Sequence, residues 1–231
     1  MTGEGFDWLG LLRAHTDRFA DLIADADLDV PVTFCPNWSL RDLVIHLGGV
    51  HRWAAHAVVE GNPDLRPEHF DGGRSELVAW YRQHASRLIA VLADTPADAP
   101  AWTMDQRDRT AGFWRRRQVH ETVMHVWDAE QALGETRPID PLLAWNGVLE
   151  VSEVFYPRQV RLARIRPLPT AVRLVATDVP GDVTIGDGEA AAMVRERAEV
   201  LLRLLWHRVD ADAETTDPRA ARVLTSVAVT P

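Results

Sequence analysis

The chain has 231 residues, of which 46% are hydrophobic, enough for one sizeable core or for one domain and a small second one. A net charge of −9 without a sustained basic patch argues against nucleic acid as a partner. The single cysteine, Cys35, excludes an intramolecular disulfide. We see neither a signal peptide nor a stretch near the ~18 apolar residues that span a bilayer. We therefore expect a soluble, cytoplasmic protein that uses neither a membrane nor nucleic acid.

The spacing of apolar residues predicts four helices in the N-terminal part. Ser39 followed by Asp42 is typical of a capping box, which marks where the second of them begins. Gly134 marks where the fourth one ends. Four amphipathic helices with short to moderate loops predict an antiparallel four-helix bundle. The predicted helices cover residues 6–26, 39–60, 74–93 and 110–133.

The pattern changes after a fifth predicted helix at residues 140–162. Alternating residues predict strands, which are followed by two further helices. The strands are expected at 170–177, 182–187 and 191–196, and the helices at 199–208 and 218–226. We therefore predict a mainly α fold with a small α+β C-terminal domain. The boundary is placed so that residues 1–166 form the bundle with its added helix and residues 167–231 form the α+β domain.

Three residues in two predicted helices form the most informative pattern of the chain. Glu121 and His125 are four positions apart, so they share one face of a helix. His46 would be a third ligand from a neighbouring helix. Two imidazoles and one carboxylate suit zinc and leave one coordination position open, as catalytic zinc sites do. The spacing alone fits equally well an exposed helical ion pair between Glu121 and His125.

The other histidines near this pattern have a different spacing. His120 and His125 are five positions apart, about 140° around a helix, so they cannot easily hold one ion. His51 has the same spacing from His46. We expect His120 to be a neighbour of the site, and His51 and His56 to be neighbours or surface residues.

Two segments of the sequence resemble the mycothiol-dependent maleylpyruvate isomerase family, which belongs to the DinB-like metal-binding four-helix bundles. The first is WSLRDLVIHLGG, from Trp38 to Gly49, and the second is ETVMHVWDAE, from Glu121 to Glu130. The resemblance implies a DinB-like bundle whose metal ligands are His46, Glu121 and His125, supported by Trp38, Trp127 and Asp128. A weaker match covers residues 201–208, where His207 stands at a position that is commonly glycine in the family.

The resemblance also implies a chemistry. A divalent metal, most simply zinc, would bind the thiol mycothiol as cosubstrate and lower its pKa, so that the thiolate dominates at neutral pH. The thiolate would attack an electrophilic small molecule, and the outcome would be isomerisation or transfer of the thiol. Mycothiol is the thiol of actinobacteria, which agrees with a chain whose 25 basic residues are all arginine.

An anionic substrate would need cationic partners, and arginine binds carboxylates in bidentate fashion. We expect candidates in Arg52 beside the first ligand, in Arg82, and in Arg208 or Arg222 near the C-terminus. Residues 115–117 are three consecutive arginines, and we expect them on a solvated face of a helix. Cys35 is assigned no role.

Two other functions are compatible with the same residues. One is a non-catalytic bundle that binds a metal or a ligand. The other is a metal-dependent hydrolase with metal-bound water as the nucleophile, for which His120 or Asp128 would be the candidate base. The sequence leaves open whether the metal is zinc, nickel or iron, and whether the protein is a monomer or a homodimer.

Overall fold

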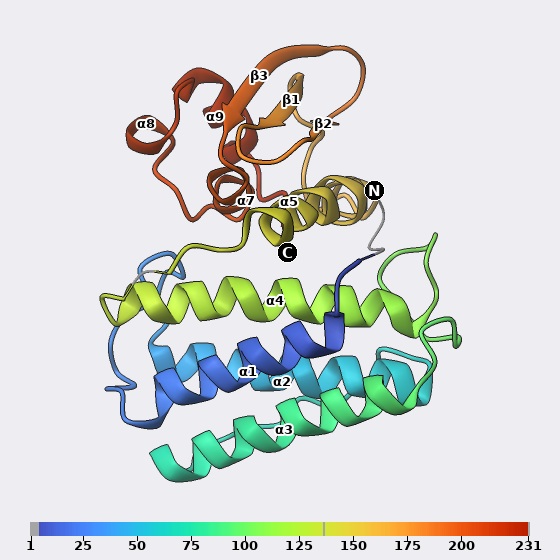
Figure 1. Ribbon diagram of the computed structural model, residues 1–231, viewed down its shortest axis with the longest axis vertical. Coiled ribbons are helices and arrows are strands. Elements are labelled where there is room, and N and C mark those ends of the chain that lie inside the picture. Colours follow the sequence, from blue (N-terminus) through green and yellow to red (C-terminus); the bar gives the residue numbers. More distant parts are fainter. Residues whose placement is uncertain (1–4, 136, 231) are drawn as a thin grey trace. The chain divides into compact units, whose positions relative to one another are not determined.

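The computed structural model describes residues 5–135 and 137–230. Contacts between Cα atoms divide the chain into two compact units, one ending at Arg137 and the other beginning at Pro138 (Figure 1). The predicted fold class is confirmed, because helices predominate and a small mixed sheet follows them. The predicted boundary after residue 166 falls inside the second unit, and a domain boundary at that position stays a prediction.

The first unit is a four-helix bundle whose helices agree with the predicted ranges within two residues at each end. Its helices are α1 (Trp8–Ala24), α2 (Leu40–Glu60), α3 (Arg74–Asp94) and α4 (Ala111–Ala132).

The boundaries of α2 follow from local chemistry. The Ser39 hydroxyl accepts a hydrogen bond from the Asp42 backbone N–H, and the Asp42 carboxylate accepts one from the Ser39 N–H at 2.8 Å. The predicted capping box is therefore confirmed. At the other end, Gly61 adopts a left-handed conformation with φ of 66°, in which glycine ends a helix at little cost.

The order of the helices brings α2 and α4 side by side in opposite directions (Figure 1). His46 near the start of α2 lies against Glu121 of α4, and Trp53 near its end lies 5.2 Å from the ring of Trp114. The helix α3 packs on α2 in the same direction, since residues 61–73 return along the bundle (Figure 1). The predicted antiparallel arrangement is therefore wrong for this pair of helices. The side chains packed between the helices form a hydrophobic core, which includes Phe19, Ile23, Leu40, Leu43, Leu47, Leu77 and Tyr81.

The second unit combines helices with a three-stranded sheet of order β2-β1-β3, in which β1 pairs antiparallel with β2 and parallel with β3. The predicted fifth helix is present, but one π-helical turn divides it, and the short α8 was not predicted. The elements are α5 (Pro141–Glu150), the π turn η1 (Val151–Phe155), α6 (Tyr156–Arg161), β1 (Ala171–Ala176), β2 (Asp182–Ile185), β3 (Ala190–Glu196), α7 (Ala198–Leu205), α8 (Ala211–Glu214) and α9 (Pro218–Thr225).

His207 stands at a position where the resemblance implies glycine, and its backbone is left-handed. Its φ of 56° lies in the left-handed region, which glycine adopts at the lowest cost and histidine more readily than most residues. The His207 ring nitrogen Nε2 lies 3.1 Å from the carbonyl oxygen of Val227. This contact helps to stabilise His207 in a left-handed backbone conformation that is unfavourable for most residues with a side chain.

Substitution of two adjacent glycines of α2 by alanine is expected to have opposite effects on stability. A Cβ at Gly48 would overlap the ring of Trp80, whereas a Cβ at Gly49 would meet nothing within 4 Å. Alanine stabilises a helix interior by about 1 kcal/mol relative to glycine, but overpacking costs about 1–3 kcal/mol. We expect Gly49→Ala to raise the free energy of unfolding by about 1 kcal/mol and Gly48→Ala to lower it by a similar amount. Urea denaturation of both variants checks this, and equal effects would contradict the packing of Trp80 on α2.

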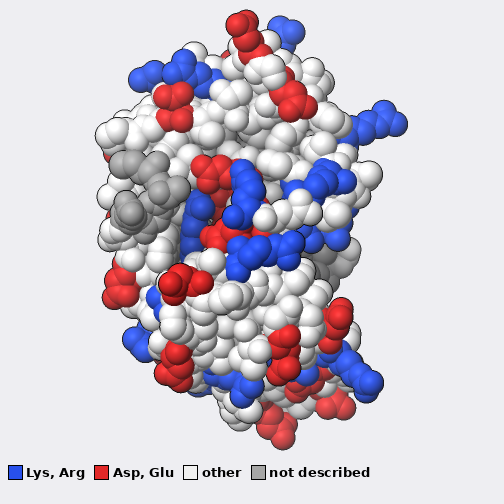
Figure 2. Space-filling view, turned by 90° about the vertical axis from the view of Figure 1, so that its right-hand side faces the viewer, with Lys and Arg blue, Asp and Glu red and all other residues white. Residues whose placement is uncertain are grey.

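No helix among the described residues is long and apolar enough to cross a membrane. On the face that Figure 2 shows, the described arginine and acidic side chains are interspersed and form no broad patch of positive charge.

Candidate metal centre

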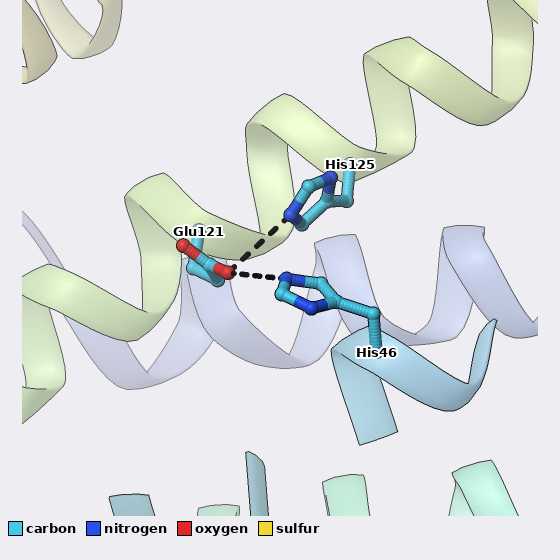
Figure 3. Close-up of side chains that lie close together, drawn as sticks. All are labelled: His46, Glu121 and His125. Carbon is cyan, nitrogen blue, oxygen red and sulfur yellow. Dashed lines mark hydrogen bonds and ion pairs between the residues drawn. The ribbon is translucent and has the colours of Figure 1, made fainter. Parts of the chain in front are cut away.

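The candidate ligands lie on two neighbouring helices of the first unit. Glu121 and His125 are one turn apart on α4, and His46 projects toward them from α2 (Figure 3). Nearly the whole circumference of α4 is buried at this level, since all residues from Arg117 to Glu130 are shielded from solvent. A carboxylate at such a position needs partners, because an unpaired buried charge is costly.

The ligand atoms face one another. His46 Nε2 and His125 Nε2 each lie 3.3 Å from Glu121 Oε1 (Figure 3). One ligand atom from each of the three residues lies within 4.8 Å of the other two. Glu121 and His125 are buried and His46 is partly exposed, so the alternative of an exposed ion pair on α4 is wrong.

These distances fit a zinc ion. Two ligand atoms bound at 2.0–2.1 Å with tetrahedral angles lie about 3.3 Å apart, which is the separation of each imidazole nitrogen from Glu121 Oε1. Nitrogen and oxygen donors of this kind also suit other divalent transition metals. The residues can thus hold a metal through three protein ligands, and the side chain of His46, which is 35% exposed, leaves one side of the group accessible.

Asp128 orients His125. The His125 Nδ1 atom lies 3.0 Å from Asp128 Oδ2, so the carboxylate accepts the Nδ1 hydrogen and leaves Nε2 directed at the group. Carboxylates commonly fix a metal-binding histidine in this way. The ring of Trp38 lies 4.9 Å from that of His46. Both residues therefore stand where the family resemblance implies supporting residues.

Arg117 is buried in the bundle, contrary to the position expected from the sequence. The arginines at 115–117 were expected on a solvated helix face, but only 2% of the Arg117 side chain is exposed, and its guanidinium pairs with Glu121 Oε2. Arg115 donates hydrogen bonds to the carbonyl oxygens of Leu92 and Thr95 at the end of α3. Arg117 thus occupies one oxygen of Glu121 and leaves the other for the two histidines.

The electrostatics of the group follow from these contacts. Burial by itself would raise the pKa of Glu121, but the charge of Arg117 and hydrogen bonds from His125 and His46 hold it well below its usual value. Burial would likewise lower the pKa of His125, but hydrogen bonds to Asp128 and Glu121 outweigh burial and raise it to about 9. In the metal-free protein, a carboxylate therefore faces a protonated imidazole.

A pH dependence of metal binding follows, because a metal must displace the proton of His125. The raised pKa means that protonation of His125 stabilises the metal-free fold below the ordinary value of 6.5, and that this contribution is lost as the pH rises through about 9. We expect the apparent zinc affinity to rise about tenfold per pH unit between about pH 7 and about pH 9. Competition with a chromophoric chelator measures it, and an affinity independent of pH would contradict a protonated His125.

The other histidines lie outside the group of three. His51 is buried, its Nε2 lies 3.1 Å from Thr122 Oγ1, and burial lowers its pKa to about 3. His120 is buried with its ring 5.7 Å from that of Trp8, and His56 lies near Asn62. All three positions agree with the expectation that these residues are neighbours of the site or surface residues.

The candidate arginines differ in their surroundings. Arg52 lies in a pocket that His46 also lines. Arg82 is half-exposed and pairs with Asp21 at 3.5 Å. In the second unit, Arg208 is buried and donates a hydrogen bond to the Trp206 carbonyl at 2.7 Å. Arg222, also there, is an exposed residue paired with Asp212. Within the first unit, Arg52 alone of the candidates adjoins the metal ligands in the described residues.

Sequence reasoning missed Gln118. It lies one turn before Glu121 on α4 and is 1% exposed. Neither its amide nitrogen nor its amide oxygen has a hydrogen-bond partner among the described residues. A buried amide of this kind normally has partners, so Gln118 is an unsatisfied polar group one turn from Glu121. The only sequence signal was its spacing of seven residues from His125, which places both on one helix face.

A family model described as the mycothiol maleylpyruvate isomerase N-terminal domain matches residues 9–130. This match covers more than half of the chain and contains all three candidate ligands. The chain belongs to the mycothiol maleylpyruvate isomerase family. No curated protein matches the sequence significantly.

Two solved structures share the fold of the chain. A crystal structure of a mutant of the mycothiol-dependent maleylpyruvate isomerase has a TM-score of 0.66 and 12% sequence identity. Another crystal structure of the mycothiol-dependent maleylpyruvate isomerase has a TM-score of 0.62 and 14% identity. Each alignment covers 88% of this chain and 89% of the other. Because the sequence identities are low, these similarities show only that the fold is shared.

Proposed function

We propose that this member of the family is a mycothiol-dependent metalloenzyme that acts on an electrophilic small molecule by isomerisation or by transfer of the thiol. The observation that carries the proposal is the convergence of His46, Glu121 and His125 with spacings that fit zinc. The family match supports mycothiol as the cosubstrate. Structures named mycothiol-dependent maleylpyruvate isomerase, which share the fold, agree with it.

Each residue of the group has a separate task in this proposal. When bound, a divalent cation would lower the pKa of a thiol that coordinates to it. His46, Glu121 and His125 would hold the cation, Asp128 keeps the His125 ring in place, and Arg117 keeps Glu121 from binding through both oxygens. Because three protein ligands leave a coordination position open, a thiol can enter without displacing a side chain.

The thiolate sulfur would then add to an electrophilic carbon, such as that of a conjugated double bond. If the bond rotates and the thiol leaves, the net result is isomerisation, and if the adduct persists, the result is S-transfer. Both outcomes need the same ligands. The identity of the substrate therefore depends on the residues around the group rather than on the group itself.

Metal content and thiol dependence test the proposal together. We expect about one equivalent of metal in the wild-type protein and none in His125→Ala. Turnover of maleylpyruvate should require both the metal and mycothiol. Because His125 is buried and its replacement could disturb the fold, His46→Ala serves as a second variant at a partly exposed ligand. His69→Ala, an exposed histidine between α2 and α3, is the matched control that should retain metal.

Two results would contradict the proposal. Wild-type protein that takes up no metal even after reconstitution would show that the three residues are not a metal site. Turnover without any thiol would show that the thiol is not the nucleophile.

A further inference from the structure

A pocket of about 310 Å³ lies in the first unit, on the side of α2 that carries His46. Its size is near the lower end of the range of small-molecule sites. The segment between α2 and α3 forms one wall, and it is tied to α2 by the Trp53 Nε1–H, which donates to the Pro63 carbonyl at 3.0 Å. The lining residues are Ile45, His46, Gly49, Val50, Arg52, Trp53, Leu65, Arg66, Pro67, Glu68 and Trp80.

Most of the lining of the pocket is apolar. Its two arginines have N–H groups that donate no hydrogen bond to the described residues. Arg52 contacts Glu68 Oε2 through Nε at 3.1 Å and the Arg66 carbonyl through Nη1 at 3.0 Å. Its Nη2 atom donates no hydrogen bond among the described residues, and neither does the guanidinium of Arg66, an exposed residue. Guanidinium groups beside indole rings and aliphatic side chains suit an anion with an apolar, planar body.

Glu68 keeps the pocket from being purely cationic and fixes its geometry. It accepts a hydrogen bond from Trp80 Nε1 at 3.0 Å and lies 3.9 Å from His84 Nε2. With two arginines and one glutamate at the pocket, one positive charge is left uncompensated. That balance favours an anion with a single carboxylate over a neutral ligand.

We propose that this pocket binds a planar organic carboxylate, with its carboxylate at Arg52 and Arg66 and its apolar body against the indoles of Trp53 and Trp80. His46 belongs to both the pocket and the candidate metal centre. A molecule in the pocket therefore lies beside one of the three candidate ligands, whereas Glu121 and His125 do not line the pocket. Only the step that makes the bound carboxylate the electrophile rests on the proposed function.

Benzoate is the probe, and binding is followed by the indole N–H signals of ¹⁵N-labelled, metal-free protein. We expect saturable shifts of the Trp53 and Trp80 signals, each assigned with a Trp→Phe variant. The Trp38 ring lies 4.9 Å from His46, so a dominant shift of its signal would place benzoate at the metal ligands and overturn the proposal. Benzamide has the same ring without the charge, and its affinity should be lower than that of benzoate by at least about tenfold.

Three variants separate the pocket from general effects on the fold. Arg52→Gln should weaken benzoate binding about tenfold, and Arg13→Gln, at an exposed position of α1, should leave it unchanged. Gly49→Leu should fill the pocket, because a Cβ there meets nothing within 4 Å. It should abolish binding while raising the melting temperature, since it removes a glycine from a helix interior.

The outcomes distinguish the pocket from the proposed function. Equal binding of benzoate and benzamide, or wild-type affinity in Gly49→Leu, would overturn the pocket assignment even if thiol-dependent turnover is observed. Benzoate binding that follows the three variants as expected would support the pocket, even if no thiol-dependent turnover is found and the proposed function fails.

Discussion

Replacing Glu121 by glutamine is expected to abolish metal binding and to destabilise the metal-free protein. The change removes the carboxylate that both histidines face, and it removes the negative charge that pairs with the buried guanidinium of Arg117. Breaking a buried ion pair from one side costs about 3 kcal/mol or more. The affinity for zinc should fall at least about a hundredfold, beyond the 10–100-fold typical of residues that only support a ligand.

Two measurements check this expectation. Competition with a chromophoric chelator gives the zinc affinity, and urea denaturation with a chelator present gives the stability of the metal-free form. Glu60→Gln, an exposed glutamate at the end of α2, is the matched control and should change neither quantity. Wild-type zinc affinity in Glu121→Gln would show that the carboxylate is not a ligand.

Replacing Arg117 by methionine is expected to destabilise the metal-free protein as well, but to leave metal binding intact. The metal-free protein should lose about 3 kcal/mol of stability, because the Glu121 carboxylate stays buried without the arginine charge. Metal binding should persist, since all three ligands remain and a cation would compensate the carboxylate in place of the guanidinium. Zinc should therefore stabilise this variant more than it stabilises the wild type.

The double variant Arg117→Met/Glu121→Gln completes a cycle with the two single changes. Because both single changes break the same buried ion pair, the double variant should be less destabilised than the sum of the two. Thermal denaturation with and without zinc, beside the exposed Arg13→Met as control, measures all terms. Additive losses, or loss of zinc binding in Arg117→Met, would contradict a role of Arg117 that acts through Glu121.

Much of the fold was predictable because local signals and the tertiary structure agree. The Ser39 capping box and the Gly61 stop place α2 correctly, and the alternation of apolar residues places the strands of the second unit. The π turn at Val151–Phe155 was not predicted, because it is a single turn inside a segment whose residues favour a helix throughout. Division of the chain into units depends on contacts distant in sequence, which periodicity does not report.

The candidate site shows the same limit. The four-residue spacing placed Glu121 and His125 on one face, but spacing alone could not separate a buried metal site from a surface ion pair. Burial decided this, and it also decided against the solvated position expected for Arg117. An arginine in a run of three is typical of a surface, so only the packing of the bundle reveals its contact with Glu121. The pocket beside His46 was equally hidden, because Arg66 and Glu68 reach it from a segment without regular structure.

The measurement that tests the central claim most directly is X-ray absorption at the zinc edge of the metal-loaded protein, before and after addition of mycothiol. Before addition, we expect only nitrogen and oxygen neighbours from His46, Glu121 and His125. After addition, one sulfur neighbour should be present at about 2.3 Å, and it should be absent when an S-methylated thiol is added instead. A zinc ion whose neighbours stay nitrogen and oxygen in the presence of saturating mycothiol would contradict the assignment of this centre as a thiol-activating site.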